Sequence, residues 1–91
     1  MSAMGEVEIF KALADPTRLK ILDFIKNDEK CICEIIPHTG KSQPNVSQHL
    51  KVMKYAGLIK ERKDGIRIMV KVANKDIFEI IDMAKKLKGN K

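Results

Sequence analysis

Apolar residues return every three or four positions through most of the chain, which is the spacing of helices that bury one face. Two helix starts are marked by Asp15 before Pro16 and by Ser42 two residues before Pro44. In each case a side chain is suited to cap free backbone N–H groups, and proline fits the first turn. Pro37 is expected to end or bend the third helix. The predicted helices cover residues 4–14, 16–28, 31–36, 42–57 and 75–87, with a turn at 38–41 and a frayed tail at 88–91.

The helix that starts at Ser42 has one apolar stripe, formed by Val46, Leu50 and Met53, and is expected to stop at Gly57. No acidic residue lies on its other face. Amide side chains pair with adenine edges, and lysine pairs with guanine or phosphate, so this face suits a major groove. A solvated polar face is the plainer alternative. The candidate DNA-binding residues of this helix are Ser42, Gln43, Asn45, Ser47, Gln48, Lys51 and, at the edge of the stripe, His49, for which packing or a phosphate contact is favoured over base readout.

From Leu58 to Val72 the pattern changes to alternation, which is typical of strands, and Asp64-Gly65 is a strong signal for a tight turn between two of them. The alternating apolar positions are Ile66, Ile68, Val70 and Val72. The tip of this hairpin is basic, as expected of a wing that grips the sugar-phosphate backbone, although solubilising charge is the alternative. Its candidate DNA-binding residues are Lys60, Arg62, Lys63 and Arg67.

A short helix, a glycine-containing turn and a second helix with a polar face are the parts of a helix-turn-helix. Together with the hairpin they predict an α+β fold, mainly α. We expect one winged helix-turn-helix domain over residues 1–91, with four to five helices and a two-stranded β-hairpin wing. Arg18 leaves the second helix on its wet side, and we expect it to be a surface charge rather than a phosphate ligand.

The composition narrows the class of partner. The net charge is +6 with a pI of about 9.5, so an anionic partner such as nucleic acid or a membrane surface is favoured. No apolar stretch approaches the roughly 20 residues that span a bilayer, and Glu6 and Glu8 interrupt the place of a signal peptide. Two cysteines are too few to stabilise a secreted fold of this kind by disulfides, so a reducing compartment is expected. We expect a cytoplasmic protein with no membrane partner.

An enzyme is not expected, because the chain has no phosphate-cradling glycine loop, no HExxH and no nucleophile motif. The rival from another class is a protein-interaction or architectural module on the same fold. The amide-rich face argues against it, since nonspecific DNA binders use mainly cations.

The first and last predicted helices carry more apolar surface than a small domain needs for itself. Phe10 and Val7 stand in the first, and Ile77, Ile80 and Ile81 in the last. We infer that both helices pack against a second copy of the chain. The alternative is that they only close the core of the monomer.

Four stretches resemble the ArsR/SmtB-type family of winged helix-turn-helix repressors: FKALADPTRLKIL, CICEI, SQPNVSQHLKVMKYAGLI and ERKDGIRIMVKV. They follow the family's order over nearly the whole chain. The resemblance implies a homodimer built from the first and last helices, and binding to double-stranded DNA at an imperfect palindromic operator. It also implies repression that is relieved by an inducer or by oxidation, with no cofactor required for DNA binding.

Cys31 and Cys33 fall where members of that family carry a cysteine motif for soft thiophilic ions such as arsenite, antimonite, cadmium, lead or zinc. Thiolates prefer such ions, and a closed site needs three or four ligands. Residues two apart on a helix point about 200° from one another, so we expect the pair to converge on one ion only if the helix unwinds.

This chain departs from the family's metal patterns. Ile36 stands at the position of a third cysteine, and the last helix offers Asp76, Glu79 and Asp82 but no histidine. A third ligand could come from His38, from the twin subunit, or from an exogenous thiol or water. Three roles of the cysteines stay open: soft-metal or metalloid sensing, thiol redox sensing, or simple apolar packing.

Overall fold

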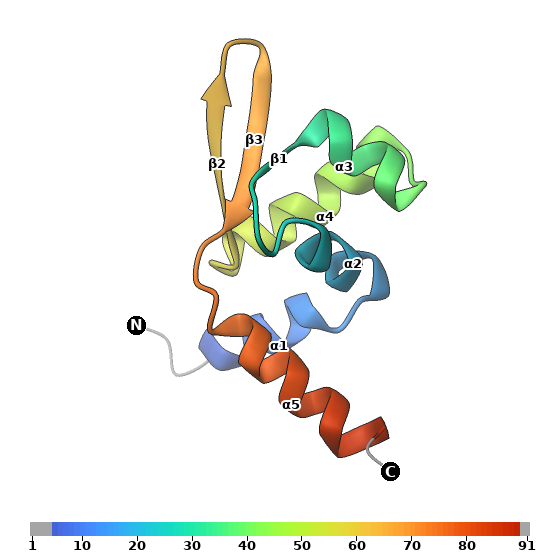
Figure 1. Cartoon of the computed structure of the whole chain (residues 1–91), viewed down its shortest axis with the longest axis vertical. Helices are drawn as coiled ribbons and strands as arrows, with labels where there is room; N and C mark the ends of the chain where they lie inside the picture. The colour runs from blue at the N-terminus through green and yellow to red at the C-terminus, as the bar shows by residue number, and fades with distance from the viewer. Residues whose placement is uncertain (1–4, 90–91) are drawn as a thin grey trace.

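The computed structural model describes residues 5–89, so the predicted helix start at Met4 and the tail residues 90–91 lie outside it. Five helices and a three-stranded sheet pack together, with the hairpin projecting from one end and the last helix lying at the other (Figure 1). The helices are α1 (Gly5–Leu13), α2 (Pro16–Phe24), α3 (Ile32–Thr39), α4 (Gln43–Tyr55) and α5 (Ile77–Gly89), and the strands are β1 (Lys30–Cys31), β2 (Ile59–Asp64) and β3 (Arg67–Val72). The predicted α+β winged fold is confirmed.

Both predicted helix caps are present. Asp15 accepts hydrogen bonds from the backbone N–H groups of Thr17 (2.8 Å) and Arg18 (3.1 Å), and the Ser42 hydroxyl accepts one from Asn45 (3.2 Å). Burial raises the pKa of Asp15, but the two backbone hydrogen bonds and nearby positive charge outweigh it and leave the pKa below its ordinary value. These caps fix where α2 and α4 begin.

The core lies between α2, α3 and α4 and is closed by the sheet and α5. The predicted stripe of α4 is confirmed, because Val46, Leu50 and Met53 are each no more than 1% exposed. The other members of the core cluster are Ala12, Ile21, Leu22, Ile25, Ile35, Leu58, Ile59, Val70 and Ile77. Packing on three sides holds α4 with its polar face outward.

The sheet is antiparallel with the order β1-β3-β2, and β1 was not predicted. Two residues are too few to show alternation, yet Cys31 lies opposite Met69 of β3, which in turn lies opposite Arg62 of β2. The hairpin turn is Gly65-Ile66 rather than Asp64-Gly65, with Gly65 at φ 65° in the first position. Ile66 was therefore wrongly predicted to continue the alternation of the strand: it stands at the wing tip and is fully exposed.

The boundaries of α2, α3 and α5 also differ from prediction. α2 ends at Phe24 rather than near residue 28. Ile25 is buried and so continues the apolar pattern beyond the end of the helix, whereas Asn27 and Asp28 favour turns. α3 runs through Pro37 to Thr39, so the turn is reduced to residues 40–41, with Gly40 at φ 73° as expected. α5 starts and ends two residues later than predicted, at Ile77 and Gly89, so residues 88–89 are helical rather than frayed.

Candidate DNA-binding surface and cysteine pair

The outward face of α4 carries the predicted polar side chains in exposed positions. Within residues 5–89, the side chains of Gln43, Asn45, Ser47, Gln48 and Lys51 make no hydrogen bond or ion pair to the rest of the protein. Donors and acceptors that have no partner in the molecule are available to base edges and phosphates. The face is therefore chemically suited to read a duplex.

His49 differs from these residues because it is half-buried and held. Arg18 reaches across from α2 and places Nη1 3.0 Å from His49 Nδ1. The same guanidinium donates to the carbonyl oxygens of Ala12 (2.7 Å) and Lys11 (3.3 Å) at the end of α1. Its side chain is only 15% exposed. Arg18 was predicted to be a surface charge, and that prediction is wrong, because the hydrogen bonds draw it between three helices.

The basic residues of the wing divide into exposed lysines and arginines that are paired with carboxylates. Lys60 and Lys63 are exposed, whereas Arg62 donates through Nε (3.2 Å) and Nη2 to Glu29, and Arg67 donates to Asp64 at 3.3 Å. The hydrogen bond from Arg62 lowers the pKa of Glu29 below its ordinary value, and Glu29 in turn raises the pKa of Arg62. The Arg62 side chain is thus already paired within the protein.

Cys31 and Cys33 form a disulfide, with their Cα atoms 5.0 Å apart. The expectation that they point apart is wrong, because Cys31 is not in the helix: it is the N-cap of α3, with an extended backbone (φ −71°, ψ 146°). The backbone N–H of Cys31 donates a hydrogen bond to Glu34 Oε1 (2.8 Å). Cys31 is buried and Cys33 is exposed, so the pair lies at the surface where β1 meets α3.

His38 was considered as a third metal ligand. Its ring stacks on Phe24 with 3.8 Å between ring centroids. Among residues 5–89 no three His, Cys, Asp or Glu side chains are arranged to hold a metal ion. A three-ligand site on the two cysteines would therefore need a ligand from outside the described part of one subunit.

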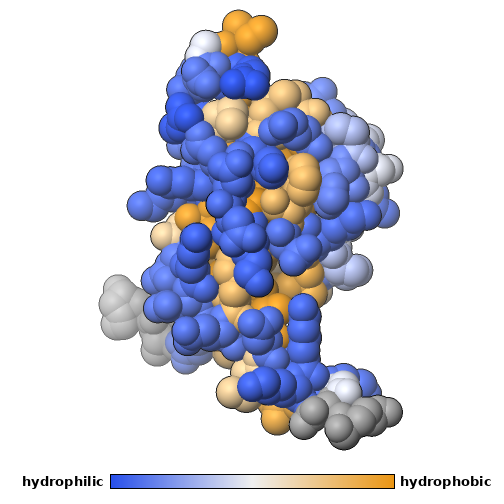
Figure 2. Space-filling model, in the orientation of Figure 1, coloured by the Kyte–Doolittle hydropathy of each residue, from blue (hydrophilic) through white to orange (hydrophobic). Residues whose placement is uncertain are grey.

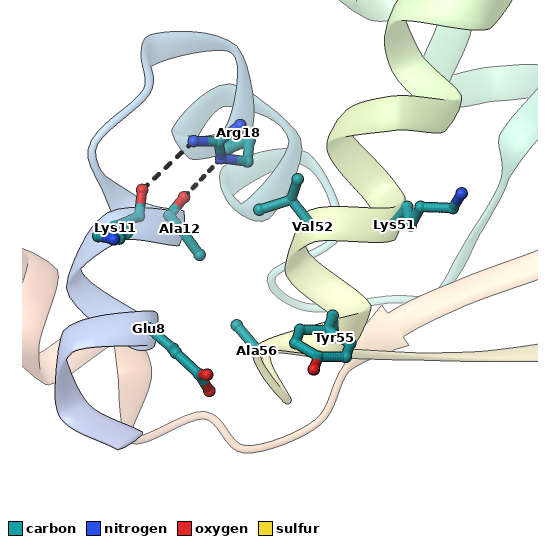
Figure 3. A pocket seen from close by; sticks show the side chains of 8 residues that line it. All are labelled: Glu8, Lys11, Ala12, Arg18, Lys51, Val52, Tyr55 and Ala56. Carbon is teal, nitrogen blue, oxygen red and sulfur yellow. Dashed lines mark hydrogen bonds between the residues drawn. The ribbon is translucent and has the colours of Figure 1, made fainter. Parts of the chain in front are cut away.

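One exposed side chain near the predicted surface was not foreseen. Tyr55 is 84% exposed, and it lies seven residues after Gln48 and four after Lys51, which places it on the same face of α4. Continuing the helical wheel by one turn would have found it. Tyr55 also borders a hollow of about 360 Å³ between α1 and α4, with Arg18 at its other end (Figure 3).

An apolar face is left open at the end of the molecule opposite the wing. Helices α1, α2 and α5 border a hollow of about 560 Å³ there. Phe10, Met83 and Leu87 are 57%, 56% and 83% exposed, and Ile80 is 41% exposed. Apolar surface is visible among the charged side chains over α5 in Figure 2.

Within residues 5–89, none of the helices combines the length and the hydrophobicity that a membrane span requires.

Comparisons with known proteins agree with this geometry. The family model for the bacterial regulatory protein, arsR family, matches residues 15–61, just over half of the chain. An uncharacterized HTH-type transcriptional regulator of Methanocaldococcus jannaschii is 42% identical over 88% of this chain and 91% of its own length. A probable mercury resistance operon repressor of Streptomyces lividans is 40% identical over 84% of this chain, but the match spans only 61% of that protein.

Among solved structures, the homodimeric winged helix-turn-helix domain (fragment 1–100) of a possible ArsR-family regulator from Mycobacterium bovis superposes with a TM-score of 0.81. It is 26% identical, with coverage of 96% of this chain and 86% of that one. The family model and the 42% identical relative each reach far enough along the chain to assign its family. The chain therefore belongs to the arsR family of bacterial regulatory proteins, as a DNA-binding winged helix-turn-helix transcriptional regulator.

Proposed function

We propose that this protein is a homodimeric repressor that binds an imperfect palindromic operator and releases it when its cysteine pair reacts. The observation that carries the proposal is the face of α4, whose amide, hydroxyl and ammonium groups are exposed and lack partners within residues 5–89. In this model Gln48 and Asn45 contact base edges, and the wing lysines and arginines contact phosphates. Such a protein acts where the DNA is, in the cytoplasm.

The proposed dimer interface is the apolar face of α1 and α5. Its exposed Phe10, Met83 and Leu87 are the kind of surface that a small domain covers with a second copy. The Mycobacterium bovis relative, whose structure is homodimeric, supports this choice of partner. Pairing through this face would set the spacing between the two copies of α4, the proposed reading helix. That spacing must match successive turns of the duplex.

The interface is tested by Met83→Lys, with Asp82→Lys as the control at the neighbouring position, which is exposed but does not line the hollows of the apolar face. Met83→Lys is expected to give a monomer in light scattering at about 10 µM and to lose operator binding, because dimerisation would bury the lysine charge among apolar side chains. Asp82→Lys is expected to stay dimeric. A dimeric Met83→Lys would contradict the proposed interface.

In this proposal the cysteine pair is the sensor. Cys31 pairs with Met69 of β3 and caps α3, so it touches both the wing and the helix that precedes α4. We suppose that this junction has one conformation that binds DNA and one that does not. A ligand that binds the second conformation more tightly than the first would lower the DNA affinity by the ratio of its two affinities. Thiolates prefer soft ions, and the relation to a mercury resistance repressor supports a soft metal or metalloid inducer, such as arsenite, cadmium or zinc. The remaining ligand would come from the twin subunit, an exogenous thiol or water.

Oxidation is the second candidate trigger, and the observation that favours it is the Cys31–Cys33 disulfide itself. With a peroxide as oxidant, the two thiols lose two electrons and two protons. The peroxide O–O bond breaks, one S–S bond forms, and two molecules of water leave when the oxidant is hydrogen peroxide. Cys33 is exposed and is the sulfur that a peroxide can reach first.

The experiment is fluorescence anisotropy on the duplex upstream of the protein's own gene, with arsenite, cadmium, zinc or peroxide added to reduced protein. A metal inducer predicts release that a chelator or excess dithiol reverses, and an oxidant predicts release that only a reductant reverses. Cys31→Ser and Cys33→Ser should each stay bound in both cases. If every agent releases wild type and both variants equally, the cysteines are not the sensor.

The same titration separates a regulator from an architectural module. Specific binding should exceed binding to an unrelated duplex by roughly 10³-fold or more. A ratio near one at physiological salt would favour the architectural alternative.

A further inference from the structure

Arg18 joins three helices through one guanidinium. Nε and Nη2 donate to the last carbonyl groups of α1, at Ala12 (2.7 Å) and Lys11 (3.3 Å), as the dashed lines in Figure 3 show. Nη1 lies 3.0 Å from Nδ1 of His49 on α4. The Asp15 carboxylate, 4.0 Å away, adds an opposite charge. With the side chain 15% exposed, the bonds to Ala12 and His49 are partly shielded from water, and the bonds together hold the guanidinium in one orientation.

The chemistry of arginine decides which nitrogen of His49 carries the proton. A guanidinium has five N–H donors and no acceptor, so His49 Nδ1 must accept the bond. In the neutral ring the proton then lies on Nε2. His49 Nε2 has no hydrogen-bond partner among the described residues, and no buried side-chain nitrogen or oxygen in that part of the chain lacks one. Nε2 is therefore at the protein surface, as a donor.

We infer that Arg18 is a positioning residue for DNA binding: it fixes His49 as the Nε2–H tautomer so that this N–H donates to a DNA phosphate, and it locks α4 against the end of α1. The inference rests on the proposed function of α4 as the reading helix. His49 lies at the border between the buried stripe and the exposed face, where a phosphate rather than a base edge is within reach. Because α1 belongs to the proposed dimer face, Arg18 also connects that face to the reading helix.

The tautomer is tested without DNA by ¹⁵N NMR of the histidine side chains at alkaline pH, where the neutral ring is observed. Wild type is expected to show His49 predominantly as Nε2–H. Arg18→Met is expected to give a mixture of tautomers, with a cooperative thermal transition as the check that it folds. A predominant Nδ1–H form in wild type overturns the inference, whether or not Arg18→Met folds.

The DNA contact is tested with a matched pair of variants. The amide nitrogen of glutamine replaces Nε2–H, whereas that of asparagine lies near the position of Nδ1. His49→Gln is expected to keep the affinity within about threefold, and His49→Asn to lose about five- to tenfold on specific and unrelated duplexes alike, the loss typical of one hydrogen bond. Equal losses in both variants would overturn the phosphate contact.

A double-mutant cycle separates positioning from general packing. Arg18→Met should weaken DNA binding in wild type but add less than twofold in His49→Asn, since the donor it orients is already gone. Additive losses would contradict the inference. The proposed function fails in a different way, through absence of specific binding by wild type, and the NMR result would stand regardless.

Discussion

The reading helix and the wing were predicted to bind the same duplex, but they differ in how their polar groups stand without it. On α4 the amides and Lys51 have no partner within residues 5–89, while on the wing Arg62 is bound to Glu29 and Arg67 to Asp64. A group with no partner loses only hydration when it meets DNA. A paired arginine must also leave its carboxylate, so its net gain is smaller.

This difference assigns separate tasks to the two regions. The caps and the buried stripe hold α4 rigidly, so its side chains suit geometric readout of base edges. The wing contributes charge, which depends on salt and is insensitive to sequence. Selectivity should therefore reside in α4 and the salt dependence in the wing.

The largest expected effect is on sequence choice. Gln48→Ala should reduce the preference for the operator over a duplex with its contacted base pair changed by about 10- to 100-fold, because a bidentate amide–adenine pair gives about 1–3 kcal/mol of discrimination. Lys54→Ala is the control on the same helix, since Lys54 is engaged with Glu61 at 3.3 Å. The measurement is competition anisotropy. An unchanged preference for the operator in Gln48→Ala would mean that other residues read the base sequence.

A smaller effect, of a different kind, is expected at the wing. Arg62→Ala should weaken operator and unrelated duplex alike by about three- to tenfold at low salt and lower the slope of log K against log salt by about one. Its readout is a salt titration on both duplexes, with Lys54→Ala again as the control. A loss of sequence choice as large as that of Gln48→Ala would break the division between helix and wing.

The sequence was sufficient for the helices and the hairpin, because their apolar periods and caps are local signals. It was not sufficient for β1, since two residues carry no period. Cys31 has an extended rather than a helical backbone, so the 200° separation expected of two helical residues does not apply to Cys31 and Cys33. The role of Arg18 was missed for a related reason. Its partners are carbonyl groups of α1 and a ring on α4, which no spacing within the chain brings together.

The wing pairs show the same limit. Arg62 and Glu29 are 33 residues apart, and only the antiparallel packing of β1 beside β3 brings the loop before β1 within reach of β2. Arg67 and Asp64 face each other across the turn and could have been paired from the hairpin register alone. The candidate residues were thus predictable as a set, whereas their occupied or open state was not.

The smallest expected effect comes from releasing Arg62 rather than removing it. Because the pKa of Glu29 is lowered by Arg62, the pair is complete at neutral pH and is lost only as the pH falls through that depressed value. Glu29→Gln imitates the uncharged form at pH 7. It should raise the affinity for every duplex by about two- to threefold at low salt, in keeping with the modest strength of exposed ion pairs.

The matched control for Glu29→Gln is Glu61→Gln, which removes a carboxylate from β2 of the wing and releases Lys54, a residue outside the proposed contact set. Both variants add one unit of positive charge, so long-range attraction of DNA rises equally in each. Any further gain in Glu29→Gln, measured by anisotropy at 50 and 200 mM salt, then belongs to the freed Arg62. Equal gains in the two variants would mean that Arg62 stays away from the phosphates. The wing would then act without Arg62, through Lys60, Lys63 and Arg67.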